Sequence, residues 1–98
     1  MIQILWIIEY KPDRLPEFEN AYGVNGRWAQ LFRMAEGYIE TCLKRDIENT
    51  NRFLVIDHWR DLESFESFKR RYQSAYDELD HHCEELTLVE TKIGIFSS

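Results

Sequence analysis

Apolar residues recur along this chain with two different periods. Four segments have apolar residues at every second position or in an unbroken run, which predicts β-strands because successive strand side chains point to opposite faces. These strands are expected at residues 2–10, 38–46, 52–59 and 87–96. Two other regions have apolar residues every three or four positions, which is the period of an amphipathic helix. The helical regions are 13–35, which a glycine-containing segment divides, and 62–86.

Single residues mark several ends of these elements. Pro12 closes the first strand, because proline fixes the backbone and lacks an N–H donor. Asp13 is suited to cap the first helix, and Asp61 is suited to cap the second helical region. Gly23 is suited to the left-handed conformation that often follows a helix end. The apolar stripe of residues 62–86 is continuous, which predicts one long helix or two helices in line.

The order of the predicted elements is β-α-β-β-α-β. This is the order of the ferredoxin-like split β-α-β motif, an α+β fold with an antiparallel four-stranded sheet. Right-handed crossovers place the first and third strands at the centre of the sheet and the helices on one face only. The 98 residues are enough for a single domain over 1–98 and too few for two separate cores.

The two central strands are apolar on both faces, although helices cover only one face of the sheet. The smaller of the two sets of large aliphatic side chains consists of Leu5, Ile7, Leu54 and Ile56. Leaving these side chains in water forgoes about 6–12 kcal/mol, which is comparable with a typical total stability of about 5–15 kcal/mol. We therefore expect a homodimer in which two sheets pack face to face. The alternative is a monomer whose open face binds a ligand or another protein.

Composition and charge exclude several classes of protein. The apolar share of 44% is that of a packed globule and not of a disordered chain. The net charge of −6 argues against nucleic-acid binding, which uses a basic surface. The first apolar run is interrupted by Glu9 and has no basic region before it, so we expect no signal peptide, no membrane span and a cytoplasmic location.

No pattern along the chain predicts a metal site. In the segment "DHHC" at 80–83, the two adjacent histidines diverge by about 100° on a helix and cannot face one ion. Pairs three or four residues apart are available there, but no second cluster completes a site. Cys42 and Cys83 are too few for a disulfide framework and have no metal-binding spacing.

Several segments resemble the antibiotic biosynthesis monooxygenase family of the dimeric α/β barrel superfamily. They are "EYKP", "FENAYGVNGRWAQLF", "GYIETCLKRD" and "RFLVIDHWRDLESFESF". The segment 21–28 differs from the best-studied members, so the chain resembles a separate branch of the family. The resemblance implies oxygenation without flavin or metal, and therefore no cofactor. The implied substrate is a small aromatic or quinol-type molecule in a dry pocket between helices and sheet, whose deprotonated ring reacts directly with O2.

Three residues are the candidates for catalysis. Trp59 matches the family's pocket tryptophan at the end of the third strand and would stack on a flat substrate. Asp57 shares its face, and a carboxyl among apolar neighbours is expected to have a raised pKa that suits a general base. Arg33 would hold an oxyanion, or Tyr22 would donate a hydrogen bond to it. The alternatives are that Trp59 only fills the core and that Asp57 is neutralised by an arginine or a tyrosine hydroxyl.

Tyr22, Trp28 and Phe53 are the candidates for substrate binding. Tyr22 and Trp28 flank two glycines in the segment 22–35, which could act as a lid, and Phe53 shares the face of Asp57. Alternatively, this segment is only a break between helices, with Trp28 in the core. His58 points to the opposite face, where we expect a hydrogen-bonded residue of the dimer interface.

Haem cleavage, the other reaction of the family, is disfavoured. Its pattern needs an asparagine in the first strand and a histidine roughly three turns into the helix after the tryptophan. The first strand offers only Gln3 as an amide, and the helix has Lys69, Arg70 and Arg71 at that depth. Without an axial imidazole, iron has no protein ligand.

The sequence thus leads to one principal function and two alternatives. The principal hypothesis is a cofactor-independent monooxygenase that oxidises a small aromatic or quinol-type substrate with O2. The first alternative is a non-catalytic barrel that binds an apolar small molecule or serves as an accessory module. The second is an isomerase that uses the same pocket and base but consumes no oxygen.

Overall fold

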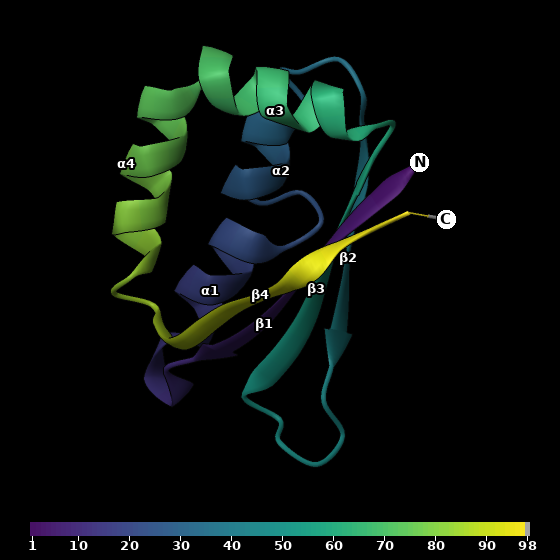
Figure 1. Cartoon of the computed structure of the whole chain (residues 1–98). Coiled ribbons are helices and arrows are strands. Elements are labelled where there is room, and N and C mark those ends of the chain that lie inside the picture. Colours follow the sequence, from purple (N-terminus) through teal and green to yellow (C-terminus); the bar gives the residue numbers. More distant parts are fainter. Residues whose placement is uncertain (98) are drawn as a thin grey trace.

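An antiparallel sheet forms one side of the molecule, and the helices all lie against one of its faces (Figure 1). The computed structural model describes residues 1–97. The sheet has four strands in the order β2-β3-β1-β4. The strands are β1 (Ile2–Tyr10), β2 (Tyr38–Arg45), β3 (Arg52–Trp59) and β4 (Thr87–Ser97). The first and third strands are therefore central, as the sequence predicts, and the ferredoxin-like α+β fold is confirmed.

The helical elements fill the two connections that cross the sheet. A 3-10 turn, η1, and two short helices lie between β1 and β2, and two further helices lie between β3 and β4. They are η1 (Pro12–Arg14), α1 (Leu15–Tyr22), α2 (Arg27–Phe32), α3 (Leu62–Arg71) and α4 (Gln73–Cys83).

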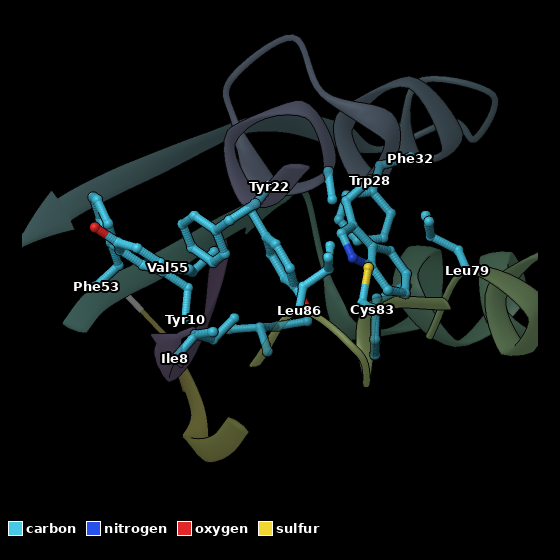
Figure 2. Packing of buried hydrophobic residues seen from close by; sticks show 14 of the residues in the cluster. Ile8, Tyr10, Tyr22, Trp28, Phe32, Phe53, Val55, Leu79, Cys83 and Leu86 are labelled. Carbon is cyan, nitrogen blue, oxygen red and sulfur yellow. The ribbon is translucent and has the colours of Figure 1, made fainter. Parts of the chain in front are cut away.

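Strand alternation decides which side chains face the helices. In β3, Phe53, Val55, Asp57 and Trp59 are buried, whereas the residues between them are only half-buried. The core under the helices is largely aromatic (Figure 2). Its rings follow one another in contact from Phe18 through Tyr22, Trp28 and Phe32 to Trp59, with centroid separations of 4.8–6.4 Å.

The region 62–86 is not one straight helix. It is divided at Tyr72, whose backbone (φ −115°, ψ 28°) leaves the helical region, and α4 then turns sharply away from α3 (Figure 1). The expectation of one helix or two helices in line is therefore wrong. The apolar stripe keeps the same period on both helices, because both bury one side against the same core.

Two of the predicted helix caps differ in outcome. Asp61 caps α3, since its side chain accepts a 2.8 Å hydrogen bond from the Ser64 N–H. Asp13 does not cap α1: it lies within η1, and the N-cap residue of α1 is Arg14, which makes no side-chain capping bond. The extra 3-10 turn moves the helix start beyond the reach of Asp13.

The expected left-handed glycine is also at a different position. Gly23 is extended (φ −61°, ψ 166°), and a Cβ there would lie 2.6 Å from the Glu19 carbonyl oxygen. Close approach of the backbone, and not a left-handed turn, therefore favours glycine there. Among the described residues, Gly37 has the positive φ, 92°, and a Cβ on it would collide with Ser64.

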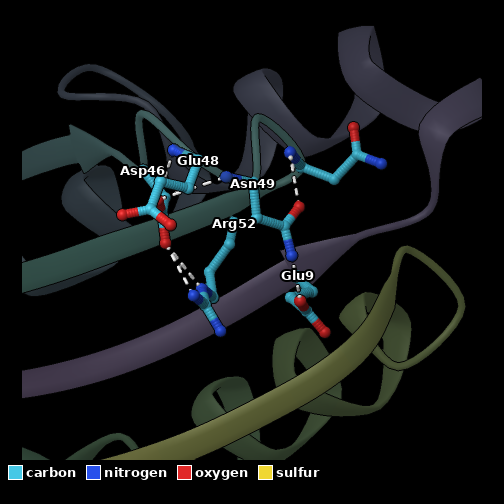
Figure 3. A network of polar contacts seen from close by, with 6 residues as sticks. Glu9, Asp46, Glu48, Asn49 and Arg52 are labelled. Atoms are coloured by element: carbon cyan, nitrogen blue, oxygen red, sulfur yellow. Dashed lines mark hydrogen bonds and ion pairs between the residues drawn. The ribbon is translucent and has the colours of Figure 1, made fainter.

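A polar network fixes the hairpin between β2 and β3 (Figure 3). Asp46 accepts hydrogen bonds from the N–H groups of Glu48 and Asn49 at 2.8 and 3.2 Å and pairs with Arg52 at 2.7 Å. The Asn49 side chain donates to Glu9 on β1 at 2.7 Å. These contacts join the hairpin to the central strand and help to fix the strand register that positions the site below.

Candidate active site

A cavity lies between the helix-facing side of the sheet and the helices. Its free volume is about 30 Å³, enough for one or two water molecules but not for an aromatic substrate. Its walls are mostly aromatic and aliphatic, with Trp6, Ile8, Val55, Phe32 and Phe65 among them. The ionisable and hydroxyl-bearing residues of the lining are Tyr22, Thr41, Asp57, Tyr76 and Glu90.

Asp57 is the most deeply buried carboxyl of this cavity. It is 6% exposed, and its hydrogen-bond partner is Thr41, whose Oγ1 donates to Asp57 Oδ1 at 2.8 Å. Burial raises the pKa of Asp57 to about 6, while the Thr41 bond favours the ionised form and opposes that rise. Within residues 1–97, no arginine, lysine or histidine forms an ion pair with Asp57. The expected raised pKa is therefore found, and the partner is a threonine hydroxyl.

A chain of hydroxyl groups leads from Asp57 to Tyr38. Because the single proton of Thr41 Oγ1 is donated to Asp57, Thr41 accepts at its contact with Tyr38, where the two oxygens are 2.8 Å apart. Tyr38 is half-buried at the start of β2. The chain thus fixes the carboxyl of Asp57 and connects it to the end of the sheet.

A second carboxyl of the cavity belongs to Glu90, which the sequence reasoning missed. Burial raises the pKa of Glu90 to about 7, and the negative charges of Asp80 and Glu84 add to the effect. Glu90 faces the helices because it pairs with Ile8 of β1. Register shifts interrupt the alternation of inward and outward side chains along β4. The sequence pattern therefore does not tell which face Glu90 is on, and its pairing with Ile8 does.

Tyr22 and Trp28 also line the cavity. Tyr22 Oη and Trp28 Nε1 are buried without a hydrogen-bond partner in the described part of the chain. The Cys83 thiol interacts with both groups, and Trp28 Nε1 lies beside its sulfur in Figure 2, but neither contact has the full geometry of a hydrogen bond. Burial, and next the charge of Glu90, raise the pKa of Tyr22 well above its usual range. Unsatisfied buried donors are costly, and a ligand oxygen would satisfy them.

The remaining predicted residues lie outside the cavity lining. Trp59 is completely buried and supports the cavity wall, with ring centroids 5.6 Å from Phe32 and 5.4 Å from Phe65. Phe53 lies near the hairpin end of β3, with its ring centroid 5.2 Å from that of Phe18. Arg33 is exposed and is the C-cap residue of α2.

Arg33 holds the connection between α1 and α2 in place. Its Nη2 donates to the Val24 carbonyl oxygen and to Asn25 Oδ1, both at 2.9 Å. The structure thus brings Asp57, Tyr22 and Trp28 together and leaves Trp59, Phe53 and Arg33 in supporting positions.

The cavity offers no imidazole or thiolate to a haem iron. His58 lies on the opposite face of the sheet, and His81 and His82 are exposed on α4. Neither described cysteine is among the lining residues. The residues around this narrow cavity therefore do not fit haem held by such a ligand.

In the described residues, no helix is both long and apolar enough to cross a membrane.

Solved structures resemble this chain over nearly its whole length. A variant of SnoaB, a cofactor-independent oxygenase from Streptomyces nogalater, has a TM-score of 0.80 at 18% identity, covering 99% of this chain and 91% of that one. A conserved protein from Methanosarcina mazei Go1 has a TM-score of 0.66 at 20% identity, with coverages of 99% and 91%. A variant of MhuD with two manganese protoporphyrin IX molecules bound per active site has a TM-score of 0.72 at 17% identity, with coverages of 100% and 94%. At these identities, the likeness shows a common fold.

The family follows from the sequence match. No protein with a curated description matches the chain. The sequence model of the family described as "Antibiotic biosynthesis monooxygenase" matches residues 1–81, which is most of the chain, and the fold agrees with this match. The chain therefore belongs to the antibiotic biosynthesis monooxygenase family.

Proposed function

We propose that this protein is a cofactor-independent monooxygenase that oxidises a small, electron-rich aromatic or quinol-type substrate with O2. The observation that carries the proposal is Asp57: a buried carboxyl without a cationic partner, whose pKa is about 6, in an aromatic cavity. Such a group is ionised at neutral pH and remains basic enough to accept a proton from an acidic phenol or enol. Family membership supports the same reaction class.

In this proposal the substrate supplies the electrons. Asp57 removes a proton from the substrate, and the resulting ring anion reacts with O2 to form a carbon-bound peroxide. Glu90, partly protonated near pH 7, donates a proton to the outer peroxide oxygen. Loss of the remaining proton on that carbon then breaks the O–O bond. One oxygen atom stays as a carbonyl group and the other leaves as water, so no external reductant is consumed.

The other lining groups serve to bind the substrate. Tyr22 Oη and Trp28 Nε1 have no partner with full hydrogen-bond geometry and lie near the weakly accepting sulfur of Cys83, so a substrate oxygen that reaches them gives up little in exchange. The small free volume requires the walls to move, and the segment 22–35 is the proposed lid. Trp59 and Arg33 act as positioning residues: Trp59 supports the wall, and Arg33 holds the connection between α1 and α2.

Oxygen uptake by wild type and the Asp57→Asn variant tests the proposal. The protein is treated with a chelator and then incubated with a panel of anthrone-like and quinol substrates. We expect kcat/KM to rise with pH through about 6, as Asp57 ionises, and to fall by roughly 10²–10⁴-fold in Asp57→Asn. Asp77→Asn, which changes an exposed carboxyl on α4, is the matched control and is expected to keep the wild-type rate. Equal uptake by Asp57→Asn and wild type would remove Asp57 from the reaction.

A second candidate function is binding without catalysis. The donors of Tyr22 and Trp28, whose nearest acceptor is the weak sulfur of Cys83, favour any ligand with an oxygen acceptor, whether or not it reacts. In that case aromatic ligands quench the fluorescence of Trp28 with equal affinity in wild type and Asp57→Asn. No substrate of the panel would then consume oxygen faster than it does in buffer.

We also propose that two copies pair through the outer face of the sheet, the face turned away from the helices. Leu5, Ile7, Leu54 and Ile56 lie there and are only half-buried in the single chain. Phe96, which pairs with Gln3 and so shares this face, is 47% exposed. The apolar surface supports a partner of the same kind.

A further inference from the structure

The outer face of the sheet also has a cluster of three metal-binding side chains. Glu40 and Cys42 are two residues apart on β2, so they point to the same side. His58 on β3 pairs directly with Glu40 in the strand register. One ligand atom from each of the three residues lies within 4.8 Å of the other two.

The three side chains offer the donors that zinc prefers. Thiolate, imidazole and carboxylate bind Zn²⁺ at about 2.0–2.3 Å in tetrahedral geometry, which places neighbouring ligand atoms roughly 3.3–3.8 Å apart. Cys42 Sγ and Glu40 Oε1 are already 4.0 Å apart. Rotations about the side-chain bonds of exposed Glu40 and half-buried His58 are enough to close the remaining gap.

We propose that Glu40, Cys42 and His58 form a zinc site on the outer face of the sheet. Three protein ligands leave the fourth tetrahedral position for a water molecule. The spacings along the chain give no ligand pattern and therefore predict no metal. The cluster comes from two strands and becomes visible only when their register is known.

The proposed zinc site is separate from the cavity. Asp57 and His58 are neighbours in the chain, but they point to opposite faces of the sheet, so zinc would not touch the cavity lining. β2 is an edge strand, which places the cluster beside the apolar patch of β1 and β3. Zinc would link β2 to β3 and would stabilise the folded chain, because the unfolded chain does not hold the three ligands together.

Metal titration of the purified, chelator-treated full chain tests this site. We expect one Zn²⁺ per chain in competition with a chromophoric chelator, and an absorption band from thiolate-to-metal charge transfer when Co²⁺ replaces zinc. Cys42→Ser should abolish the cobalt band. Cys42→Ser and Glu40→Gln should each weaken zinc binding by about tenfold or more. Zinc should raise the melting temperature of wild type but not that of Cys42→Ser.

The control variants are His81→Ala and His82→Ala, which change exposed imidazoles on α4. They should bind zinc as the wild type does. Equal zinc affinity in wild type, Cys42→Ser and Glu40→Gln would overturn the site, as would a cobalt complex without the charge-transfer band. Glu40 is exposed, so Glu40→Gln is expected to fold even where Cys42→Ser does not. Oxygen uptake should be the same in Cys42→Ser and wild type, so the two proposals fail independently.

Discussion

Burial of Asp57 costs the folded protein free energy whenever this carboxyl is ionised, because the aromatic cavity solvates a charge poorly. The single Thr41 hydroxyl offsets only part of that cost. Such a group is easier to explain by function than by stability, since an amide of the same shape avoids the charge. The raised pKa therefore makes a prediction about stability as well as one about activity.

Asp57→Asn should gain stability relative to wild type as the pH rises. The folded-state pKa is about 6 against an ordinary value of 3.8, so folded wild type binds a proton more tightly than the unfolded chain does. The stabilisation that protonated Asp57 gives folded wild type is therefore lost as the pH rises from about 4 to about 6. Above about 6, the contribution of Asp57 to the free energy of unfolding no longer changes with pH. The free energy of unfolding of Asp57→Asn minus that of wild type should increase by roughly 2–3 kcal/mol between pH 4 and pH 8.

Urea unfolding at several pH values measures this difference. Glu90 has its own raised pKa, but it is present in both proteins and cancels in the comparison. A difference that stays constant with pH would mean that Asp57 titrates like an ordinary exposed carboxyl.

At the residue scale, strand alternation alone was enough to place Asp57 on the helix-facing side, and the glycine-flanked segment indicated Tyr22 and Trp28. Glu90 could not be found in this way, because a register shift in β4 hides its orientation. Arg33 has the right charge for an oxyanion, but it is the exposed residue that ends α2, and its bonds to Val24 and Asn25 hold its guanidinium on the connection between α1 and α2. Side-chain partners of this kind are not visible in a periodic pattern.

At the scale of elements, the connection from α2 to β2 depends on Gly37. A residue with a side chain at φ 92° costs about 1–2 kcal/mol for the left-handed backbone alone, and its Cβ would also collide with Ser64. We expect Gly37→Ala to lower the free energy of unfolding by at least this amount in a urea titration. Gly94→Ala is the control, because its Cβ would meet only the movable Phe96 ring, at 3.2 Å. Similar stability losses in the two variants would contradict this explanation.

The strands were predictable because their alternation and their bounding prolines, asparagines and glycines are local signals. The change of direction between the two helices of residues 62–86 was not predicted, since the break at Tyr72 carries no proline or glycine and the apolar period continues through it. After the break, α4 runs in a new direction and leads into β4 (Figure 1). β4 is the edge strand on the opposite side of the sheet from β2. Tertiary packing and not local sequence thus decides the break.

At the scale of the whole molecule, the outer sheet face predicts self-association. Sedimentation velocity at micromolar concentration should show a dimer for wild type and a folded monomer for Leu54→Glu, because a buried, unpaired carboxylate is strongly unfavourable at the paired face. Ile47→Glu, in the hairpin loop at 94% exposure, is the matched control and should remain dimeric. A wild-type monomer, or a Leu54→Glu dimer of unchanged strength, would remove the proposed pairing.

In the proposed reaction the folded chain itself, without flavin or metal, inserts one atom of O2 into an aromatic substrate held beside Asp57. Mass spectrometry of the product formed under ¹⁸O2 by chelator-treated protein is the sharpest test of this reaction. We predict one ¹⁸O atom per product molecule with wild type, the second atom in water, and only background product with Asp57→Asn. Product without ¹⁸O, or labelled product formed equally fast by Asp57→Asn, would contradict it.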